Sequence, residues 1–478
     1  MRHCRLTGPR AHVLCPAILG LLCAIGMAQS PASSASRTGP PAAIGSSASN
    51  DRTPKDGPAL VRTTAAVLHN PCKGPHVDIE KLNQLGSDTS FPPYADTITG
   101  AGNPLRRQML CGDWTYRIFN PPSFTVNTLQ AWVPKSQQVF IGQRPTWSTG
   151  PSLGLIADLA SIHLPGWQFT ATGIYGRASW FWAFPNTLKM AQLVLYKPLL
   201  HDRLSIRFGY QDNDSEFVGT SVGGSMSSGS QGVYAVLPYE VGLSYMPLTS
   251  PTVIVRAQPV GDFYAKAGLQ RSMSPDGEPT ELARNPTGFR FAPKGDGLLK
   301  VFEGGYNRAA REDAHEFWVR GGYFDNSTPY ANLKTGTKTA GNNCEFLLVD
   351  RQLHEGDTEH PNHGLYLGAS AIAVPPQMNA YARYYELRMY QIAPFRRRPS
   401  DLVSVVSSYS NYSSYFTKAN IAAGKTAATH AATLTGSYSM RVHAGIYMVG
   451  GASYDSRPAV TPKLPGALTV TAQAALFF

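Results

Sequence analysis

The stretch GALTVTAQAALFF, residues 466–478, closes the chain and decides the predicted fold class. Successive side chains of a strand point to opposite faces, so alternate residues share a face. One face runs from Leu468 through Val470 to Phe478 and is apolar, whereas the other begins with two threonines and a glutamine. An apolar chain end in water would be a liability. The pattern favours a final strand that pairs with another strand and turns its apolar face to lipid.

The composition indicates apolar surface that is dispersed along the chain. Of 478 residues, 42% are hydrophobic and only 15% are charged, and the mean hydropathy is -0.19. Soluble domains carry roughly a quarter charged residues. Beyond the N-terminus there is no run of about 18 apolar residues, which a membrane-spanning helix would need. The only other structure that satisfies every backbone hydrogen-bonding group in lipid is a closed β-barrel. The sequence therefore predicts an all-β, transmembrane antiparallel β-barrel.

Residues 1–28 have the features of a signal peptide. Three arginines precede an apolar stretch at 17–25, and Gly26 and Ala28 fit the small-residue cleavage pattern. The apolar stretch is short for a membrane anchor, which is the alternative interpretation. We expect an exported and cleaved chain.

Three cysteines, Cys72, Cys111 and Cys344, would remain after cleavage. An odd number in an exported chain leaves the pairing open, although Cys72 and Cys111 are the nearer pair. A zinc site built from His69, Cys72 and His76 would have neither a standard spacing nor a clear fourth ligand. No metal and no cofactor is expected.

The chain divides into a leader region and a repetitive β region. Residues 29–66 are rich in Pro, Ser and Ala and have too little apolar surface to fold, so they predict a disordered linker. Residues 67–112 form a short periplasmic segment, in which HVDIEKLNQL can make one amphipathic helix. The predicted barrel covers 113–478.

Short alternating segments, separated by Gly, Pro, Asn and Ser, recur through the β region. In DFYAKAGLQ, for example, Phe263 and Leu269 share an apolar face, while Lys266 lies on the opposite face with Tyr264. SYSMRVHAGIYM, residues 437–448, reads as one such strand. Roughly 365 residues follow Cys111, and at roughly 22 to 24 residues for each spanning strand with its loop they suffice for about 16 strands.

From CGDW, residues 111–114, to its end the chain resembles the carbohydrate-selective porins of Gram-negative outer membranes, the OprB-type family. The resemblance rests on several segments in a shared order. They are LPGWQFTATGIYG (164–176), LVLYKPLLHDRLSIRFGYQDNDSEF (193–217), YEVGLSYMPLTSPTVIVRAQPVGDFYAKAGLQ (239–270), HGLYLGASAIAV (363–374) and RRRPSDLVSVVSSY (396–409).

The resemblance implies a sixteen-stranded pore in the outer membrane, through which small carbohydrates diffuse passively. It also implies contact with outer-membrane lipid, and it makes the terminal aromatic, Phe478, the signal that barrel-assembly machinery reads. A pore that passes sugars needs planar hydrogen-bond donors and aromatic surfaces. Our candidates for lining the lumen occupy polar registers of the expected strands: Arg203, Arg207, Lys266, Arg320, Glu386, Arg388 and Arg441.

Two of these expectations depend on local patterns. Arg203 and Arg207, four residues apart, would form a basic ladder without acids on the same strand. In YYELRMYQI the alternation fails after Tyr390, so we expect the strand with Glu386 and Arg388 to end or bulge there.

Other functions remain open at the level of sequence. The net charge of +11 falls to about +8 without the signal arginines, and its scattered cations do not suggest nucleic-acid binding. No His-Glu-x-x-His motif and no phosphate-binding Gly/Lys loop occurs, so no enzyme is expected. A general diffusion pore, a barrel hydrolase and an adhesin are the alternatives. The Gly/Ser-rich stretch at 219–232 suits an external loop or one that folds inward.

Overall fold

The computed structural model describes residues 118–132, 146–149, 152–159, 162–178, 187–201, 203–219, 233–245, 248–356, 360–443, 446–457, 460–461 and 466–477. Several predictions lie outside these residues: the signal peptide at 1–28, the linker at 29–66, the segment at 67–112 with its helix, Cys72, Cys111 and Phe478.

Antiparallel strands dominate the described chain, as the alternating pattern predicts. They are β1 (Ile118–Trp132), β2 (Thr146–Thr149), β3 (Ser152–Asp158), β4 (Gln168–Ala178), β5 (Thr187–Leu199), β6 (Leu204–Gln211), β7 (Ser250–Val260), β8 (Phe263–Arg271), β9 (Leu298–Arg308), β10 (Phe317–Ala331), β11 (Lys338–Glu355), β12 (Gly364–Ala373), β13 (Tyr381–Ile392), β14 (Leu402–Tyr412), β15 (His430–His443), β16 (Ile446–Ser456) and β17 (Gly466–Phe477).

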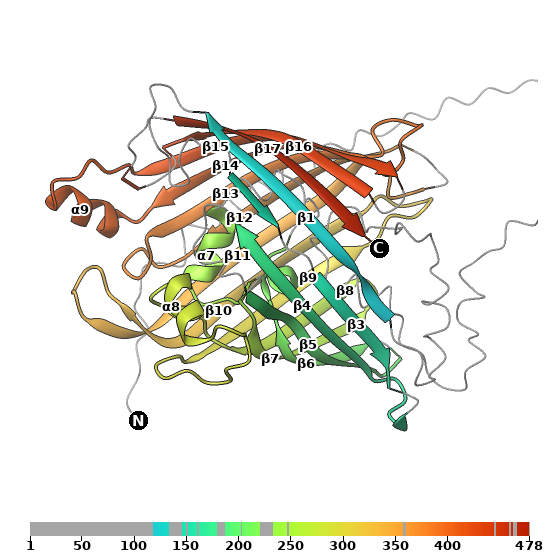
Figure 1. The fold of residues 1–478 in the computed structure, drawn as a ribbon, viewed down its shortest axis with the longest axis horizontal. Coiled ribbons are helices and arrows are strands. Elements are labelled where there is room, and N and C mark those ends of the chain that lie inside the picture. The colour runs from blue at the N-terminus through green and yellow to red at the C-terminus, as the bar shows by residue number, and fades with distance from the viewer. Residues whose placement is uncertain are drawn as a thin grey trace, which may run out of the picture. The chain divides into compact units, whose positions relative to one another are not determined.

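The strand pairing is cyclic. From β3 to β17 each strand pairs with the next along the chain, and β17 then pairs with β1 over ten successive residue pairs, from Ser123–Phe477 to Trp132–Leu468. Figure 1 shows β1 and β17 side by side. Both β2 and β3 lie between β1 and β4, so seventeen segments fill sixteen strand positions. The terminal segment is therefore a closing strand, and the all-β antiparallel barrel is confirmed.

Burial shows which face of each strand turns inward. Along β8, Tyr264 and Lys266 are buried, whereas Phe263 and Leu269 are 57% and 42% exposed. Polar side chains inside and apolar side chains outside reverse the arrangement of a soluble sheet. An apolar outer band is the surface that contacts lipid in outer-membrane barrels. The predicted registers of this strand are confirmed.

Two predicted segments differ from the structure. Residues 437–448 are not one strand but the hairpin of β15 and β16, which turns between His443 and Ile446. A register shift between Arg441 and His443 places Arg441 opposite Tyr447, so the odd/even alternation continues across the turn and periodicity alone missed it. In addition, β13 does not end at Tyr390. It continues in register to Ile392, because Ile392 packs beside Tyr390 in a small apolar cluster.

The loops at the two barrel ends differ in length. At one end β5–β6 and β7–β8 are joined by turns at 200–203 and 261–262, whereas at the other end the β6–β7 and β8–β9 connections cover 212–249 and 272–297. We call these the short-turn end and the long-loop end. Short periplasmic turns and long external loops are typical of bacterial outer-membrane barrels. The described helices belong to long-loop connections: α5 (Asp214–Phe217), α7 (Val233–Glu240), α8 (Glu278–Arg284) and α9 (Ser414–Ala422).

The β6–β7 loop folds into the barrel and covers part of its inner wall. Leu237 of α7 and Leu243 are fully buried in one apolar cluster with Phe324 of β10 and Phe346 of β11. Figure 1 shows α7 among the labels of β11, β12 and β13, and α7 contacts β12 and β13. The Gly/Ser-rich stretch at 219–232, for which an external and an inward path were the alternatives, lies outside the described residues from 220 on. No described helix is long and apolar enough to cross a membrane.

Candidate functional site

Five of the seven candidate side chains are buried on the inner face of the barrel wall. Arg320 and Arg388 are each 1% exposed, and Lys266 is 5% exposed, despite their size and charge. Charged side chains are almost never buried unless they are paired. The partners of each cation therefore decide what the lumen offers to a solute. The five are Arg207, Lys266, Arg320, Glu386 and Arg388.

Arg207 and Lys266 belong to a chain of alternating charges. Arg207 of β6 forms an ion pair with Glu216 of α5. Lys266 of β8 lies 3.8 Å from Glu216 and 3.4 Å from Glu303 of β9, and its ammonium also donates to the backbone oxygen of Glu216 at 2.5 Å. The two acids neutralise the two cations. The expectation of a bare basic ladder at Arg207 is therefore wrong.

The acid Glu216 reaches this chain because α5 lies against the wall. The ring of Phe217 packs over Gly268 of β8, where a Cβ would come within 2.7 Å of a ring carbon. Only a glycine leaves room for that ring. The position of Glu216 thus depends on a residue that carries no side chain.

Arg320 of β10 is the contrasting case. Its guanidinium stacks on the indole of Trp318, with 3.7 Å from the central carbon to the ring centre. None of its three guanidinium nitrogens has a hydrogen-bond partner among the described residues. The Trp318 indole donates to the Tyr264 hydroxyl at 3.1 Å, and that hydroxyl donates to Oε1 of Glu303 at 2.9 Å. The second carboxylate oxygen of Glu303, Oε2, is also buried and unpartnered.

Arg388 of β13 is, by contrast, saturated. Its Nε and one terminal nitrogen bind both oxygens of Asp350, at 3.0 and 2.6 Å, in a bidentate pair. Its other terminal nitrogen binds Glu386 and the Ser370 hydroxyl, each at 2.6 Å. Tyr390 adds a hydroxyl donor to Asp350 at 3.2 Å. This cluster, which we call the Arg388 clamp, ties β11, β12 and β13 together and leaves little donor capacity for a solute.

The remaining two candidates lie elsewhere. Arg203 is exposed in the turn before β6, and so it does not share the buried inner face with Arg207. The predicted strand began one residue too early there. Arg441 is half-buried near the end of β15, where its backbone N–H donates to Asp401 at 3.0 Å and its backbone oxygen accepts from Arg398 at 2.9 Å. Arg441 thus belongs to a contact network around the β13–β14 turn.

Sequence reasoning gave Glu386 as a counter-charge, and Glu386 pairs with Arg388, but it missed the other acids that neutralise these cations. Glu216 follows a strand, and Glu303 and Asp350 each lie on a strand other than that of their partner, so no motif within one segment links them. These ion pairs can be identified only from the register in which neighbouring strands pair. Lys266 lies opposite Glu303 in the β8–β9 register, which alternation within β8 alone does not reveal.

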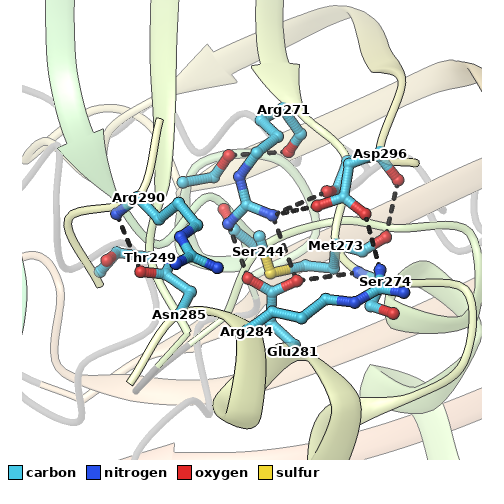
Figure 2. Close-up of polar contacts among 12 residues, drawn as sticks. Ser244, Thr249, Arg271, Met273, Ser274, Glu281, Arg284, Asn285, Arg290 and Asp296 are labelled. Carbon is cyan, nitrogen blue, oxygen red and sulfur yellow. Dashed lines mark hydrogen bonds and ion pairs between the residues drawn. The ribbon is translucent and has the colours of Figure 1, made fainter. Parts of the chain in front are cut away.

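The β8–β9 loop is held by a second ion-pair cluster, drawn in Figure 2. Arg271 at the end of β8 binds Glu281 of α8 at 2.7 Å and Asp296 at 2.8 Å. The backbone N–H of Ser274 donates to Glu281 at 3.0 Å, and Arg284 approaches Asp296 at 3.4 Å. The contacts fix α8 against the end of the barrel wall.

Two carboxyl groups of the inward loop have raised pKa values. Burial raises the pKa of Asp212 to about 7, with the neighbouring Asp214 adding to the effect. Burial raises the pKa of Glu240 to about 8, against the opposing effect of backbone N–H groups of Tyr381 and Ala380. Both groups therefore hold a proton near neutral pH more readily than an exposed carboxyl does.

A Gly-x-Ser-x-Gly pattern was expected to be absent from the sequence, and that expectation is wrong. Residues 219–223 read Gly-Thr-Ser-Val-Gly, which in hydrolases places a serine on a sharp turn between a strand and a helix. Here the pattern follows α5 and not a strand, and Ser221 lies outside the described residues. Within the described part of the chain, no group of three or more His, Cys, Asp or Glu side chains is placed to hold a metal ion.

Sixteen antiparallel strand positions in a cycle, an apolar outer face, a charged inner face and a loop folded inside define an outer-membrane porin. The family model described as carbohydrate-selective porin, OprB family, matches residues 160–477. The chain belongs to this family, and it is a sugar-preferring porin of the Gram-negative outer membrane. The family is a channel family and not an enzyme class.

Solved structures agree on the fold. The high-pH structure of Pseudomonas putida OprB has a TM-score of 0.66 at 14% identity and covers 80% of this chain and 99% of that chain. The low-pH structure of the same protein has a TM-score of 0.51 at 12% identity, covering 80% and 98%. At these identities the likeness concerns the fold alone. No curated protein matches the sequence.

Proposed function

We propose that small neutral carbohydrates pass this porin by passive diffusion and contact Arg320 and Glu303 on the way. The observation that carries the proposal is that the guanidinium nitrogens of Arg320 have no hydrogen-bond partner among the described residues, while Arg207, Lys266 and Arg388 are neutralised by acids. Glu303 Oε2, an unpartnered acceptor, belongs to the same group of side chains through Tyr264 and Trp318.

A sugar suits this combination because each hydroxyl both donates and accepts hydrogen bonds. Neighbouring hydroxyls can accept from the guanidinium of Arg320 and donate to Glu303. A buried donor or acceptor without a partner costs roughly 1–3 kcal/mol, so these contacts favour the solute. They remain weak enough for release, which a channel requires. The indole of Trp318 holds one face of the guanidinium, so the planar edge keeps its orientation.

Passive transport follows from the absence of a coupling element in the sequence, which has no phosphate-binding loop. The export and assembly of the pore belong to the same proposal. The signal peptide at 1–28 directs the chain across the inner membrane, and barrel-assembly machinery reads Phe478 at the end of the closing strand. Outer-membrane lipid then covers the apolar face of the barrel.

Liposome swelling tests the proposal. Purified protein should admit glucose faster than a size-matched amino acid. Arg320→Gln should lower the glucose rate by up to about tenfold, since one charge-assisted hydrogen bond is lost. Arg203→Gln, which removes an exposed cation from the β5–β6 turn, is the matched control and should leave the rate unchanged. Equal rates for both solutes in the wild type would favour a general pore, and no swelling would favour the hydrolase or adhesin alternatives.

A further inference from the structure

A cavity of about 450 Å³ lies at the long-loop end, apart from the charged inner wall. Three connections meet there: the end of the inward β6–β7 loop, the β8–β9 loop with α8, and the β12–β13 turn, with Tyr330 of β10 as part of the wall. Cavities of 300–1,000 Å³ are the usual size of small-molecule sites. None of the contacts described above for Arg320 or the Arg388 clamp involves this cavity.

Two tyrosines give the cavity an aromatic wall. The rings of Tyr239 and Tyr245 stack with 3.7 Å between their centres and 19° between their planes. Each hydroxyl is anchored to an acid, since Tyr239 donates to Asp214 at 3.0 Å and Tyr245 forms a hydrogen bond with Glu278. Anchored rings present a fixed apolar face, which suits the C–H face of a pyranose ring.

Carboxylates supply the polar side of the cavity. Glu281 also lines it, but Arg271 and the Ser274 N–H already occupy both of its oxygens. Glu240 and Glu278 differ, because Glu240 accepts only from the backbone N–H groups of Tyr381, at 3.3 Å, and Ala380 among the described residues, and Glu278 forms a hydrogen bond with the Tyr245 hydroxyl. Each carboxylate accepts up to about four hydrogen bonds, so both retain capacity for a ligand.

We propose that this cavity is a recruitment site for a neutral or amino pyranose, lying on the long-loop side of the lumen; this rests on the proposed sugar transport. The tyrosine pair contacts the ring face, and Glu240 and Glu278 accept from hydroxyl or ammonium groups. An amino sugar gains from the acids, and sugar carboxylates and phosphates are repelled. The cavity therefore selects solutes by charge before they reach Arg320.

The described lining of the cavity contains four acids, Glu240, Asp276, Glu278 and Glu281, and no Lys or Arg. The neighbouring cations are already engaged, since Arg284 lies 3.8 Å from Asp276 and 3.4 Å from Asp296. Lys189 of β5, buried nearby, partly offsets the charge of Glu278 and Glu281. An added ammonium group would favour the charged form of Glu240, whose pKa burial raises, and so gain an anionic partner there.

Ligand-observed NMR in detergent micelles tests the site with glucose, glucosamine and gluconate as probes. Arg320→Gln is used as the background, so that the remaining binding reports on the cavity. Added to it, Glu278→Gln should weaken glucosamine binding by about tenfold and glucose binding less, because it removes the charge and keeps the shape. Tyr239→Leu should weaken both sugars. Glu312→Gln, an exposed acid of the β9–β10 connection at the opposite end, is the matched control and should change neither.

The outcomes separate this inference from the proposed function. If glucose and glucosamine bind the Arg320→Gln background and neither added variant weakens them, the cavity is not a sugar site, whatever the swelling assay shows. Gluconate binding as tightly as glucosamine would also overturn the charge selection. If the wild type swells with no sugar at all, the transport proposal fails, and binding that still depends on Glu278 would show a site without transport.

Discussion

The Arg388 clamp makes a quantitative prediction about the stability of the barrel wall. Asp350→Asn removes the charge that holds Arg388. The Arg388 side chain is 1% exposed and the Asp350 side chain is 3% exposed. Breaking a buried ion pair by removing one partner costs about 3–5 kcal/mol, because an uncompensated charge stays buried. We place the effect at the lower end of that range, since Glu386 still binds Arg388 at 2.6 Å.

The matched control is an aspartate on the neighbouring strand. Asp325 of β10 pairs with Lys300 at 3.2 Å, but these two side chains are 49% and 51% exposed. Exposed pairs contribute about 0–1 kcal/mol. Asp325→Asn should therefore change the free energy of unfolding little. Urea unfolding in detergent micelles, followed by the loss of the folded band on unheated gels, measures both variants.

A compensating variant sharpens this test. Arg388→Gln combined with Asp350→Asn and Glu386→Gln removes the cation and both of its acids at once, so it should recover much of the stability lost in Asp350→Asn alone, since replacing a whole buried ion triad is often nearly neutral. Equal effects of Asp350→Asn and Asp325→Asn would refute the reasoning, and so would a triple variant that is less stable than Asp350→Asn alone.

Three further predictions concern the lumen, its loop and assembly. Glu216→Gln should leave the charges of Arg207 and Lys266 less compensated and produce anion selectivity in planar bilayers at low salt. This selectivity should fade above about 0.15 M salt, where the Debye length is about 8 Å. Arg203→Gln should not alter selectivity; a change with Arg203→Gln and none with Glu216→Gln would restore the ladder interpretation. The pKa of Glu240 is raised to about 8 in the folded state, so the folded protein binds this proton more tightly than the unfolded chain does. The stability that Glu240 contributes should be complete below its ordinary pKa of 4.5 and should decline as the pH rises towards 8. Glu240→Gln should lack this part of the pH dependence of unfolding, and an unchanged profile would contradict the assignment. Deletion of Phe478 should sharply reduce insertion into outer membranes, and a normal yield of heat-modifiable barrel would disprove its role as an assembly signal.

The fold was predictable from the sequence because lipid-facing strands must alternate. The registers of β8 and of Glu386 and Arg388 on β13 follow directly from period-two patterns. Alternation does not reveal the turn between β15 and β16, because a register shift beside that turn keeps the odd/even pattern unchanged. It also does not show where a strand starts, as at Arg203. These errors concern boundaries, which depend on local turns and on packing between strands.

The site was predictable only in part, because a charge on one strand says nothing about the charges on its neighbours. Lys266 and Arg320 look alike in sequence, each a cation in the polar register of an alternating segment. In the structure the first lies between two acids, and the second has none within bonding distance among the described residues. That difference arises from the β8–β9 register and from the inward path of α5, both of which are long-range features.

The near-neutral wall is itself consistent with a preference for sugars. A lumen lined by bare cations would concentrate anions, and at low ionic strength these would compete with an uncharged solute. Here Glu216, Glu303 and Asp350 cancel most of that field at short range. Each of these ion pairs still keeps the inner wall polar and hydrated. Its cation cannot turn to the outer face, because exposing an Arg or Lys to lipid at mid-depth costs about 2–4 kcal/mol. The remaining hydrogen-bond donors are then concentrated at Arg320. Sugar hydroxyl groups can accept from this guanidinium without bringing a charge of their own into the lumen.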